Sequence, residues 1–261
     1  MNRGKYICFE GSEGVGKTTQ VSLLVNYLRD QGHRVVQTKE PGTDHSPLTL
    51  ELRKLILDAQ YDDQVNGWAK LDQKISAYLA DLQFASDHTD ISTTYLKAAQ
   101  LLIVLHKRMT TESREFILQA VRSIHLQKVV APKLMTHDYI IQDRGILSGL
   151  AYGESGGVNE TFMHSMNDSV VIESGIGSNW KDCYDQIIML QGNVTKGLAR
   201  AQSAKKEFET DDVMEKRGVS FLEKVNANFS KHLKDVKHAT IIQVDNKTIN
   251  QIHEEIKGTV K

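Results

Sequence analysis

An α/β fold, with a parallel sheet of five strands flanked by helices in three layers, is predicted from two features of this sequence. Short apolar runs rich in β-branched residues alternate with longer helical patterns, which is typical of α/β proteins. A glycine-rich turn directly follows the first run and precedes a helical pattern, and this βα unit opens many doubly wound sheets. The runs lie near residues 5–9, 34–38, 138–142, 186–190 and 240–244.

The helices follow from the segments between these strands. The first begins at Lys17, and Gly32 provides a stop before the second strand. Apolar residues recur near helical spacing over 110–138, where Pro132 marks a kink or the last turns of a helix. The stretch 61–113 is interpreted as one or two additional helices inserted into the fold. Because the chain has only three prolines, we expect residues 1–261 to form a single domain.

The composition excludes several classes of partner. The 32 Lys and Arg residues nearly balance the 33 Asp and Glu residues, so a long nucleic acid is not expected to bind. The two cysteines, Cys8 and Cys183, favour a reducing compartment over a disulfide framework. No apolar stretch has the length of a signal peptide or a membrane span, and we expect a cytoplasmic protein without membrane contacts.

The turn after the first strand has the spacing of a phosphate-binding loop. Its glycines allow backbone N–H groups to converge on a β-phosphate, Lys17 reaches the β- and γ-oxygens, and the Thr18 hydroxyl can bind Mg²⁺. A glycine-rich turn without a nucleotide is the alternative. The residues expected to bind the nucleotide here are Gly11, Ser12, Glu13, Gly14, Val15, Gly16, Lys17, Thr18 and Thr19.

The third predicted strand ends in Asp143-Arg144, at the edge where ligands of open α/β sheets lie. An acidic residue there can hold magnesium, and the adjacent arginine can neutralise charge during phosphoryl transfer. A strand-end ion pair is the structural alternative. The second strand ends in the turn Lys39-Glu40-Pro41-Gly42-Thr43 at the same edge.

Taken together, these segments resemble the thymidylate kinases of the P-loop nucleoside monophosphate kinase family. The resemblance extends over most of the chain and lies in FEGSEGVGKTTQ (9–20), TKEPGT (38–43), ELRKLILD (51–58), AVRSIHLQKVVAPKL (120–134), QDRGILSGLAY (142–152), GLARA (197–201) and DDVMEKRGVSFLEKV (211–225). It implies a P-loop kinase fold with a short lid near 200–213, ATP as the phosphoryl donor, Mg²⁺ and a homodimer. The 61–113 stretch is longer than in most of the family.

The resemblance also implies roles for single residues. Lys17, Arg144, Asp143 and Glu13 match the catalytic group, and Thr18 with Asp143 matches the metal site. Glu13 approaches the acceptor sugar, Arg53 holds the acceptor phosphate, Arg122 bonds the thymine edge, and Tyr152 crowds the 2′ face of the sugar. The residues implied at the acceptor are Glu40, Pro41, Arg53, Leu118, Arg122, Arg144, Ser148, Gly149 and Tyr152. Solvated or buried side chains without these roles remain the alternative for each.

The chain departs from the family pattern in the acceptor pocket and in the lid. Leu118 stands where a stacking phenylalanine is usual, unless Phe116 takes that place, and Gly145 stands where an aromatic residue or histidine is common. Both changes suggest a roomier pocket. Val213 occupies a lid position often filled by arginine, which leaves Arg200, Lys205 and Lys206 as candidates for the donor phosphates. Asn246 matches the loop that cradles the donor adenine.

The function implied is ATP-dependent phosphorylation of dTMP, or of a close pyrimidine deoxynucleoside monophosphate, to the diphosphate. Two alternatives stay open. One is a deoxynucleoside kinase or a broad deoxynucleoside monophosphate kinase, which Arg53 would distinguish because a nucleoside has no phosphate to bind. The other is a P-loop ATPase or switch that uses 61–113 as a partner surface.

Overall fold

The computed structural model describes residues 3–42, 49, 50, 52, 53, 111–203, 217–234 and 236–260. The helical insertion expected over 61–113 lies outside these residues, apart from the backbone of 111–113. The part of the expected lid that follows Ser203, including Lys205, Lys206 and Val213, lies outside them as well.

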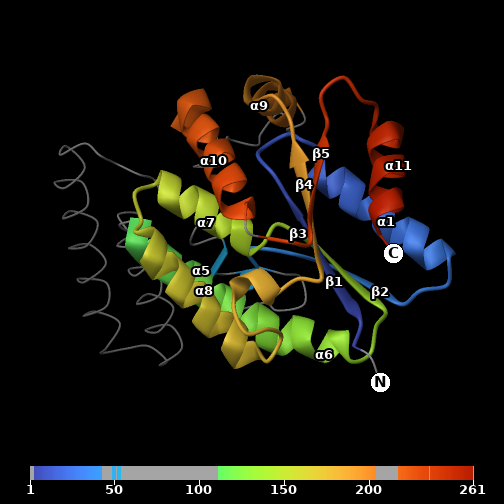
Figure 1. Ribbon diagram of the computed structural model, residues 1–261, viewed down its shortest axis with the longest axis horizontal. Helices are drawn as coiled ribbons and strands as arrows, with labels where there is room; N and C mark the ends of the chain where they lie inside the picture. Colours follow the sequence, from blue (N-terminus) through green and yellow to red (C-terminus); the bar gives the residue numbers. More distant parts are fainter. Residues whose placement is uncertain are drawn as a thin grey trace, which may run out of the picture.

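Five strands form one parallel sheet in the order β2-β3-β1-β4-β5 (Figure 1). Each lies within one residue of its predicted position, which confirms the strand predictions. The bounds are Lys5–Glu10 for β1, Val35–Lys39 for β2, Tyr139–Asp143 for β3, Gln186–Gln191 for β4 and Ala239–Gln243 for β5.

Alternate side chains of the central strand β1 enter two separate cores. Ile7 and Phe9 pack with helices α1 (Lys17–Asp30) and α11 (Ile249–Thr259) on one face of the sheet. Tyr6 and Cys8 pack on the other face in a larger core. Because neighbouring residues of a strand point to opposite faces, this pattern produces the predicted three layers. Helices that contribute to the larger core are α7 (Ile146–Ser155), α8 (Glu160–Ser174), α10 (Gly218–Leu233) and α6 (Ala131–Leu134).

The helical run predicted over 110–138 is present, with an irregular turn near its proline. It consists of α5 (Thr111–His125), a π-helical turn η1 (Leu126–Val130) and α6. Pro132 has no N–H to donate to the preceding turn, so the regular hydrogen-bond ladder cannot pass through it. The backbone N–H of Ala131 donates instead to the carbonyl of Leu126, five residues earlier, which is the π pattern.

The register of the sheet brings the carboxyl ends of three strands together. Asp143, the last residue of β3, pairs with Phe9 of β1 on one side and with Lys39 of β2 on the other. The loops that follow these strands therefore open at one edge, where ligands of parallel sheets bind. The remaining elements are η2 (Trp180–Asp182) and α9 (Val194–Ser203). Within the described ranges, no helix combines the length and apolar character needed to cross a membrane.

Candidate nucleotide-binding site

The turn between β1 and α1 has the backbone of an anion-binding loop. Gly14 and Gly16 have φ values of 65° and 90°, a region that side chains with a Cβ rarely adopt. No side chain caps the first turn of α1, so its backbone N–H groups point toward the loop. Uncapped N–H groups and the positive end of the helix dipole favour a bound phosphate.

Lys17, the first residue of α1, lies inside this loop. Its side chain is nearly enclosed, with 6% of the residue exposed, and its Nζ donates a hydrogen bond to the Ser12 carbonyl at 2.6 Å. Burial, together with the neighbouring Arg144 guanidinium, lowers the pKa of Lys17 to about 8. A nearby phosphate would favour the charged form, so this lysine is suited to bind an anion.

Thr18 and Asp143 meet across the strand ends and fit a metal ion. The Thr18 hydroxyl donates to Asp143 Oδ2 at 2.6 Å. Asp143 Oδ1 is buried and has no hydrogen-bond partner among the described residues. A hydroxyl and a carboxylate are hard oxygen ligands of the kind that Mg²⁺ prefers beside substrate phosphates. The pair predicted from the sequence as a metal site is therefore close enough to share one ion.

Arg144 forms a compact group with Glu13 and Tyr152. Its Nη2 donates to Glu13 Oε1 at 2.6 Å, and its Nη1 donates to the Gly11 carbonyl at 3.2 Å. The Tyr152 hydroxyl donates to the same Glu13 oxygen at 3.0 Å. Burial alone would raise the pKa of Glu13, but the charges of Arg144 and Lys17 lower it to about 2. Glu13 is therefore an ionised carboxylate held between the donor loop and α7.

Glu10, at the end of β1, fixes the start of α7. Its Oε1 accepts hydrogen bonds from the backbone N–H groups of Gly145 and Ser148 at 2.9 and 3.1 Å, and its Oε2 accepts one from the Ser148 hydroxyl. Burial raises the pKa of this carboxyl group. A carboxylate at a helix N-terminus satisfies the N–H groups that have no partner within the helix. Glu10 thereby fastens the helix that carries Ser148 and Tyr152 to the strand that carries the phosphate loop.

One cavity of about 670 Å³ contains most of these groups. Its basic side chains outnumber its acidic ones, which makes it a local anion site on a nearly neutral chain. The basic lining residues are Lys17, Lys39, Arg53, Arg114, Arg122, Arg144 and Arg200. The acidic ones are Glu13, Glu40 and Asp143. Among the other lining residues are Gly14, Gly16, Thr18, Thr19, Pro41, Leu118, Ser148, Gly149 and Tyr152.

Arg122 is a buried part of the cavity wall and not an exposed helical arginine. Its side chain is 3% exposed, and it forms an ion pair with Glu40 at 2.8 Å. Its Nη1 donates to the Asn167 side-chain carbonyl at 2.6 Å. On the same wall, Arg53 Nη1 donates to the Pro41 carbonyl at 2.7 Å. These contacts orient two guanidinium groups next to the turn after β2.

Leu118 and Gly145, the two departures from the family pattern noted for the pocket, have different outcomes in the structure. Leu118 lines the cavity, whereas Phe116 is 57% exposed and packs edge-on against Phe162 with ring centroids 5.4 Å apart. The helix register that places Leu118 at the pocket is therefore the observed one. At Gly145 the expectation of extra space is wrong, because a Cβ there would collide with the Tyr184 hydroxyl. Tyr184 already fills that volume.

The other predicted donor residues have different environments. Arg200 of α9 lines the cavity, but Lys205 lies outside the described residues. Asn246 lies on an exposed turn after β5 and is not a lining residue of this cavity. Val15 packs into the core with α1, so that only its backbone faces the loop. Gly14 lies so close to Gly197 of α9 that a Cβ on either one would collide with the other segment's backbone.

Three residues around the cavity were not found from the sequence. Glu10 lies outside the strand expected over 5–9 and was not singled out, although it directly precedes the phosphate loop. Asn167 of α8 gave no signal, because its role depends on the approach of α8 to α5. Arg114 lines the cavity from the first turns of α5, just beyond the inserted stretch.

The fold and this cavity define the class of the protein as a P-loop nucleotide-dependent phosphotransferase. The family model for thymidylate kinase matches residues 9–100 and 87–256. Since these matches cover most of the sequence, the chain belongs to the thymidylate kinase family.

Individual relatives agree with this assignment. The chain is 27% identical over 264 residues to a thymidylate kinase of Prochlorococcus marinus subsp. pastoris, covering 99% of this chain and 95% of the relative. It is 25% identical over 257 residues to one of Francisella tularensis subsp. holarctica, covering 97% and 94%. The crystal structure of thymidylate kinase from Ehrlichia chaffeensis superimposes with a TM-score of 0.59 at 21% identity, covering 99% of this chain and all of that one, and shows the shared fold.

Proposed function

We propose that this protein transfers the γ-phosphoryl group of ATP to dTMP and produces ADP and dTDP. The observation that carries the proposal is a single cavity with basic side chains in two groups. Lys17 and Arg144 lie beside the phosphate loop. Arg53 lies beside the turn after β2, together with Arg122, whose charge is balanced by Glu40. An ATPase needs only the first group, whereas a kinase for monophosphates must hold an anionic donor and an anionic acceptor at once. Membership of the thymidylate kinase family supports the same reaction.

The donor side is proposed to act by positioning and charge. The loop 11–19 binds the phosphates of ATP, and Lys17 would exchange its bond to the Ser12 carbonyl for the β- and γ-oxygens. An oxygen of the acceptor 5′-phosphate attacks the γ-phosphorus while the bond to the β–γ bridging oxygen breaks and ADP leaves. Arg144 lies between the loop and α7 and would stabilise the charge on the transferring group.

Thr18 and Asp143 are proposed to hold Mg²⁺. When bound, the ion would neutralise phosphate charge and orient the donor for in-line transfer. The unpartnered Oδ1 of Asp143 provides the free ligand atom on the protein side. The hydrogen bond from the Thr18 hydroxyl to Asp143 also fixes the start of α1 against the end of β3.

The acceptor is proposed to lie along α5, α7 and the turn after β2. Arg53 would hold the 5′-phosphate with its planar pair of donors, supported by Glu40 and Pro41. Glu13 would face the 3′-hydroxyl, and the Tyr152 ring would crowd the 2′ position. Leu118, Arg122, Ser148 and Gly149 would line the base.

The remaining features of the proposal concern the whole enzyme. Arg200 and Lys205 would approach the donor phosphates from the lid and exclude water, and Asn246 would contact the adenine. We further propose a single domain over 1–261, a homodimer and a cytoplasmic location. The substrates are mononucleotides and not nucleic-acid polymers.

The proposal is tested by measuring ADP release with ATP and a panel of nucleosides and monophosphates. We expect rapid release with dTMP and little release with thymidine or without an acceptor. Comparable rates with thymidine would indicate a deoxynucleoside kinase. Rapid ADP release without any acceptor would contradict the kinase assignment and support an ATPase.

We predict that Arg53→Ala raises the KM for dTMP by roughly 10- to 150-fold, because a charge-assisted hydrogen bond contributes about 1.5–3 kcal/mol. The KM for ATP should change little, since the contact belongs to one substrate. Steady-state kinetics with each substrate varied in turn provides the measurement. Arg34→Ala is the matched control, because Arg34 pairs with Asp138 near the opposite ends of the strands. Equal effects of Arg53→Ala on both KM values would remove Arg53 from the acceptor site.

We predict that Leu118→Phe sharpens the preference for dTMP over dUMP, since a ring at this position can stack on the base. Stacking contributes about 1–3 kcal/mol per base in other nucleic-acid sites, or roughly 5- to 150-fold in kcat/KM. In the wild type, the kcat/KM values for dTMP, dUMP and 5-hydroxymethyl-dUMP should lie closer together than in a strict thymidylate kinase, with dGMP and dAMP well behind. Phe116→Leu is the control, because that ring contacts Phe162 and not the cavity. An unchanged ranking in Leu118→Phe would mean that this residue does not face the base.

A further inference from the structure

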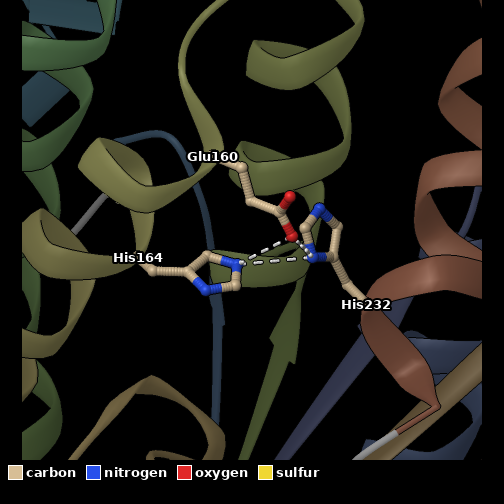
Figure 2. A group of neighbouring side chains, drawn as sticks. All are labelled: Glu160, His164 and His232. Carbon is tan, nitrogen blue, oxygen red and sulfur yellow. Dashed lines mark hydrogen bonds and ion pairs between the residues drawn. The ribbon is translucent and has the colours of Figure 1, made fainter.

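Three side chains with metal-binding groups meet on the face of the molecule formed by α8 and α10. Glu160 and His164 lie one turn apart at the start of α8, and His232 lies in the last turn of α10 (Figure 2). None of them lines the nucleotide cavity. Nothing in the proposed phosphoryl transfer uses this cluster.

The distances within the cluster suit a tetrahedral metal ion. His164 Nε2 lies 3.4 Å from His232 Nδ1, and Glu160 Oε1 lies 4.0 Å from each of these nitrogens. Ligands bound to Zn²⁺ at about 2.0–2.1 Å with tetrahedral angles are about 3.4 Å apart. The two imidazoles already have that spacing. The partly exposed Glu160 side chain needs only a small rotation to reach it, and its exposure gives an ion a path from solvent.

A second layer of contacts orients two of the three ligand atoms. His232 Nε2 lies 2.9 Å from Glu154 Oε2, so that this carboxylate accepts the Nε2 proton and leaves the lone pair of Nδ1 toward the cluster. Lys231 Nζ donates to Glu154 Oε1 at 2.5 Å and to Glu160 Oε2 at 2.7 Å, which leaves Glu160 Oε1 for a ligand. A carboxylate that orients a ligating histidine in this way is a common feature of zinc sites.

The surroundings also favour a cation. The carboxylates of Glu154 and Glu160 carry two negative charges, against one positive charge on Lys231. The Trp180 ring lies 5.5 Å from the His164 ring and 6.4 Å from the His232 ring, and it shields the imidazoles on that side. His232 itself is deeply buried, with 2% of its side chain exposed.

We propose that Glu160, His164 and His232 bind one divalent transition-metal ion of the Zn²⁺ type, with water as the fourth ligand. Two imidazoles and one carboxylate are ligands that this class of ion prefers over Mg²⁺. The bound ion fastens the end of α10 to the start of α8. Because α10 packs against α7, which carries Tyr152, the ion stabilises the wall behind the acceptor side of the cavity.

The test is a calorimetric titration of the metal-stripped full-length protein with Zn²⁺, in excess Mg²⁺ and without nucleotide. Wild type should bind one Zn²⁺ per chain at this site. His164→Ala and Glu160→Gln should lose this binding, and Glu154→Gln should weaken it by roughly 10–100-fold, as expected for a second-layer contact. His137→Ala is the matched control, because His137 lies after α6 and outside the cluster. Equal Zn²⁺ binding by wild type and His164→Ala, or no binding by wild type, would overturn the proposal.

Three further measurements separate this site from the rest of the protein. Zn²⁺ should raise the Tm of wild type and not that of His164→Ala, whose fold is checked by circular dichroism without metal. Substituting Co²⁺ should give the intense visible absorption of a tetrahedral ion in wild type only. Asp143→Asn, which alters the proposed magnesium site, should keep the same Zn²⁺ stoichiometry. If Asp143→Asn removed the bound Zn²⁺ instead, the ion would belong to the nucleotide cavity and the proposal would be wrong.

Discussion

Arg144→Ala is expected to lower kcat by about 10³- to 10⁵-fold, the range found when an arginine that stabilises a transferring phosphoryl group is removed. Arg144 lies beside the phosphate loop and donates hydrogen bonds to the Gly11 carbonyl, to Glu13 and to the Ser148 hydroxyl. Its φ is 62°, which alanine tolerates no worse than arginine, so the backbone provides no separate reason for a loss. Single-turnover rates at saturating ATP and dTMP measure the effect on the chemical step.

The control must account for Glu13, which Arg144→Ala leaves without its ion-pair partner. The double variant Glu13→Gln/Arg144→Ala removes that unpaired charge. Because Glu13 is itself proposed to face the acceptor, the double variant is compared with Glu13→Gln alone. If its Tm recovers while its kcat stays about 10³- to 10⁵-fold below that of Glu13→Gln, the loss belongs to the missing guanidinium. Arg144→Lys keeps a positive charge without the planar fork and should recover only part of the rate. A kcat within tenfold of wild type in Arg144→Ala would exclude Arg144 from the reaction.

Lys17→Met is expected to lower kcat by at least about 100- to 1,000-fold, because a preorganised donor to the developing charge is lost. Methionine keeps the apolar stem of the side chain and removes only the ammonium group. The phosphate loop should keep its conformation, since its backbone is held by glycines and by the packing of Val15 in the core. Near-normal turnover in the folded variant would exclude this loop as the donor site.

For stability, we expect the difference between wild type and Lys17→Met to depend on pH. Burial, together with the charge of Arg144, places the pKa of Lys17 at about 8 in the folded protein, below the ordinary lysine value of 10.5. Between these two pH values the unfolded chain binds more protons, so the free energy of unfolding rises with pH. Without nucleotide, wild type should therefore gain up to about 3 kcal/mol relative to Lys17→Met from pH 8 to 10.5. Denaturant unfolding of both proteins across this range measures the difference, and parallel curves would mean that Lys17 is not buried as a cation.

The strands and the phosphate loop could be predicted because their signals are local. Apolar runs mark β1 to β5 within one residue, and the glycine spacing marks the loop regardless of what packs around it. The Asp143-Arg144 pair could be placed at the same edge because the carboxyl ends of parallel strands meet there. These inferences need only the hydrophobic periodicity of the sequence and the common direction of the strands in a parallel sheet.

The contacts that orient Arg122 in the cavity wall could not be predicted in this way. Arg122, Glu40 and Asn167 come from three elements, and their hydrogen bonds depend on how α5 and α8 pack. At Gly145 the expectation of free space was wrong. The residue has no side chain, but Tyr184, which lies 39 positions later in the chain, fills the volume beside it. Local patterns give no information on volumes that distant segments share.

The attachment of α7 to Glu10 has a consequence for how such an enzyme can change during evolution. This carboxylate holds the helix that carries Ser148 and Tyr152 against the end of β1, whereas Leu118 lies on a different helix, α5. In the proposed site, substitutions at position 118 would therefore change the preferred base without loosening the frame that holds Ser148 and Tyr152. A lineage exposed to an altered base would adapt through that single helix face and keep the residues proposed to transfer the phosphoryl group.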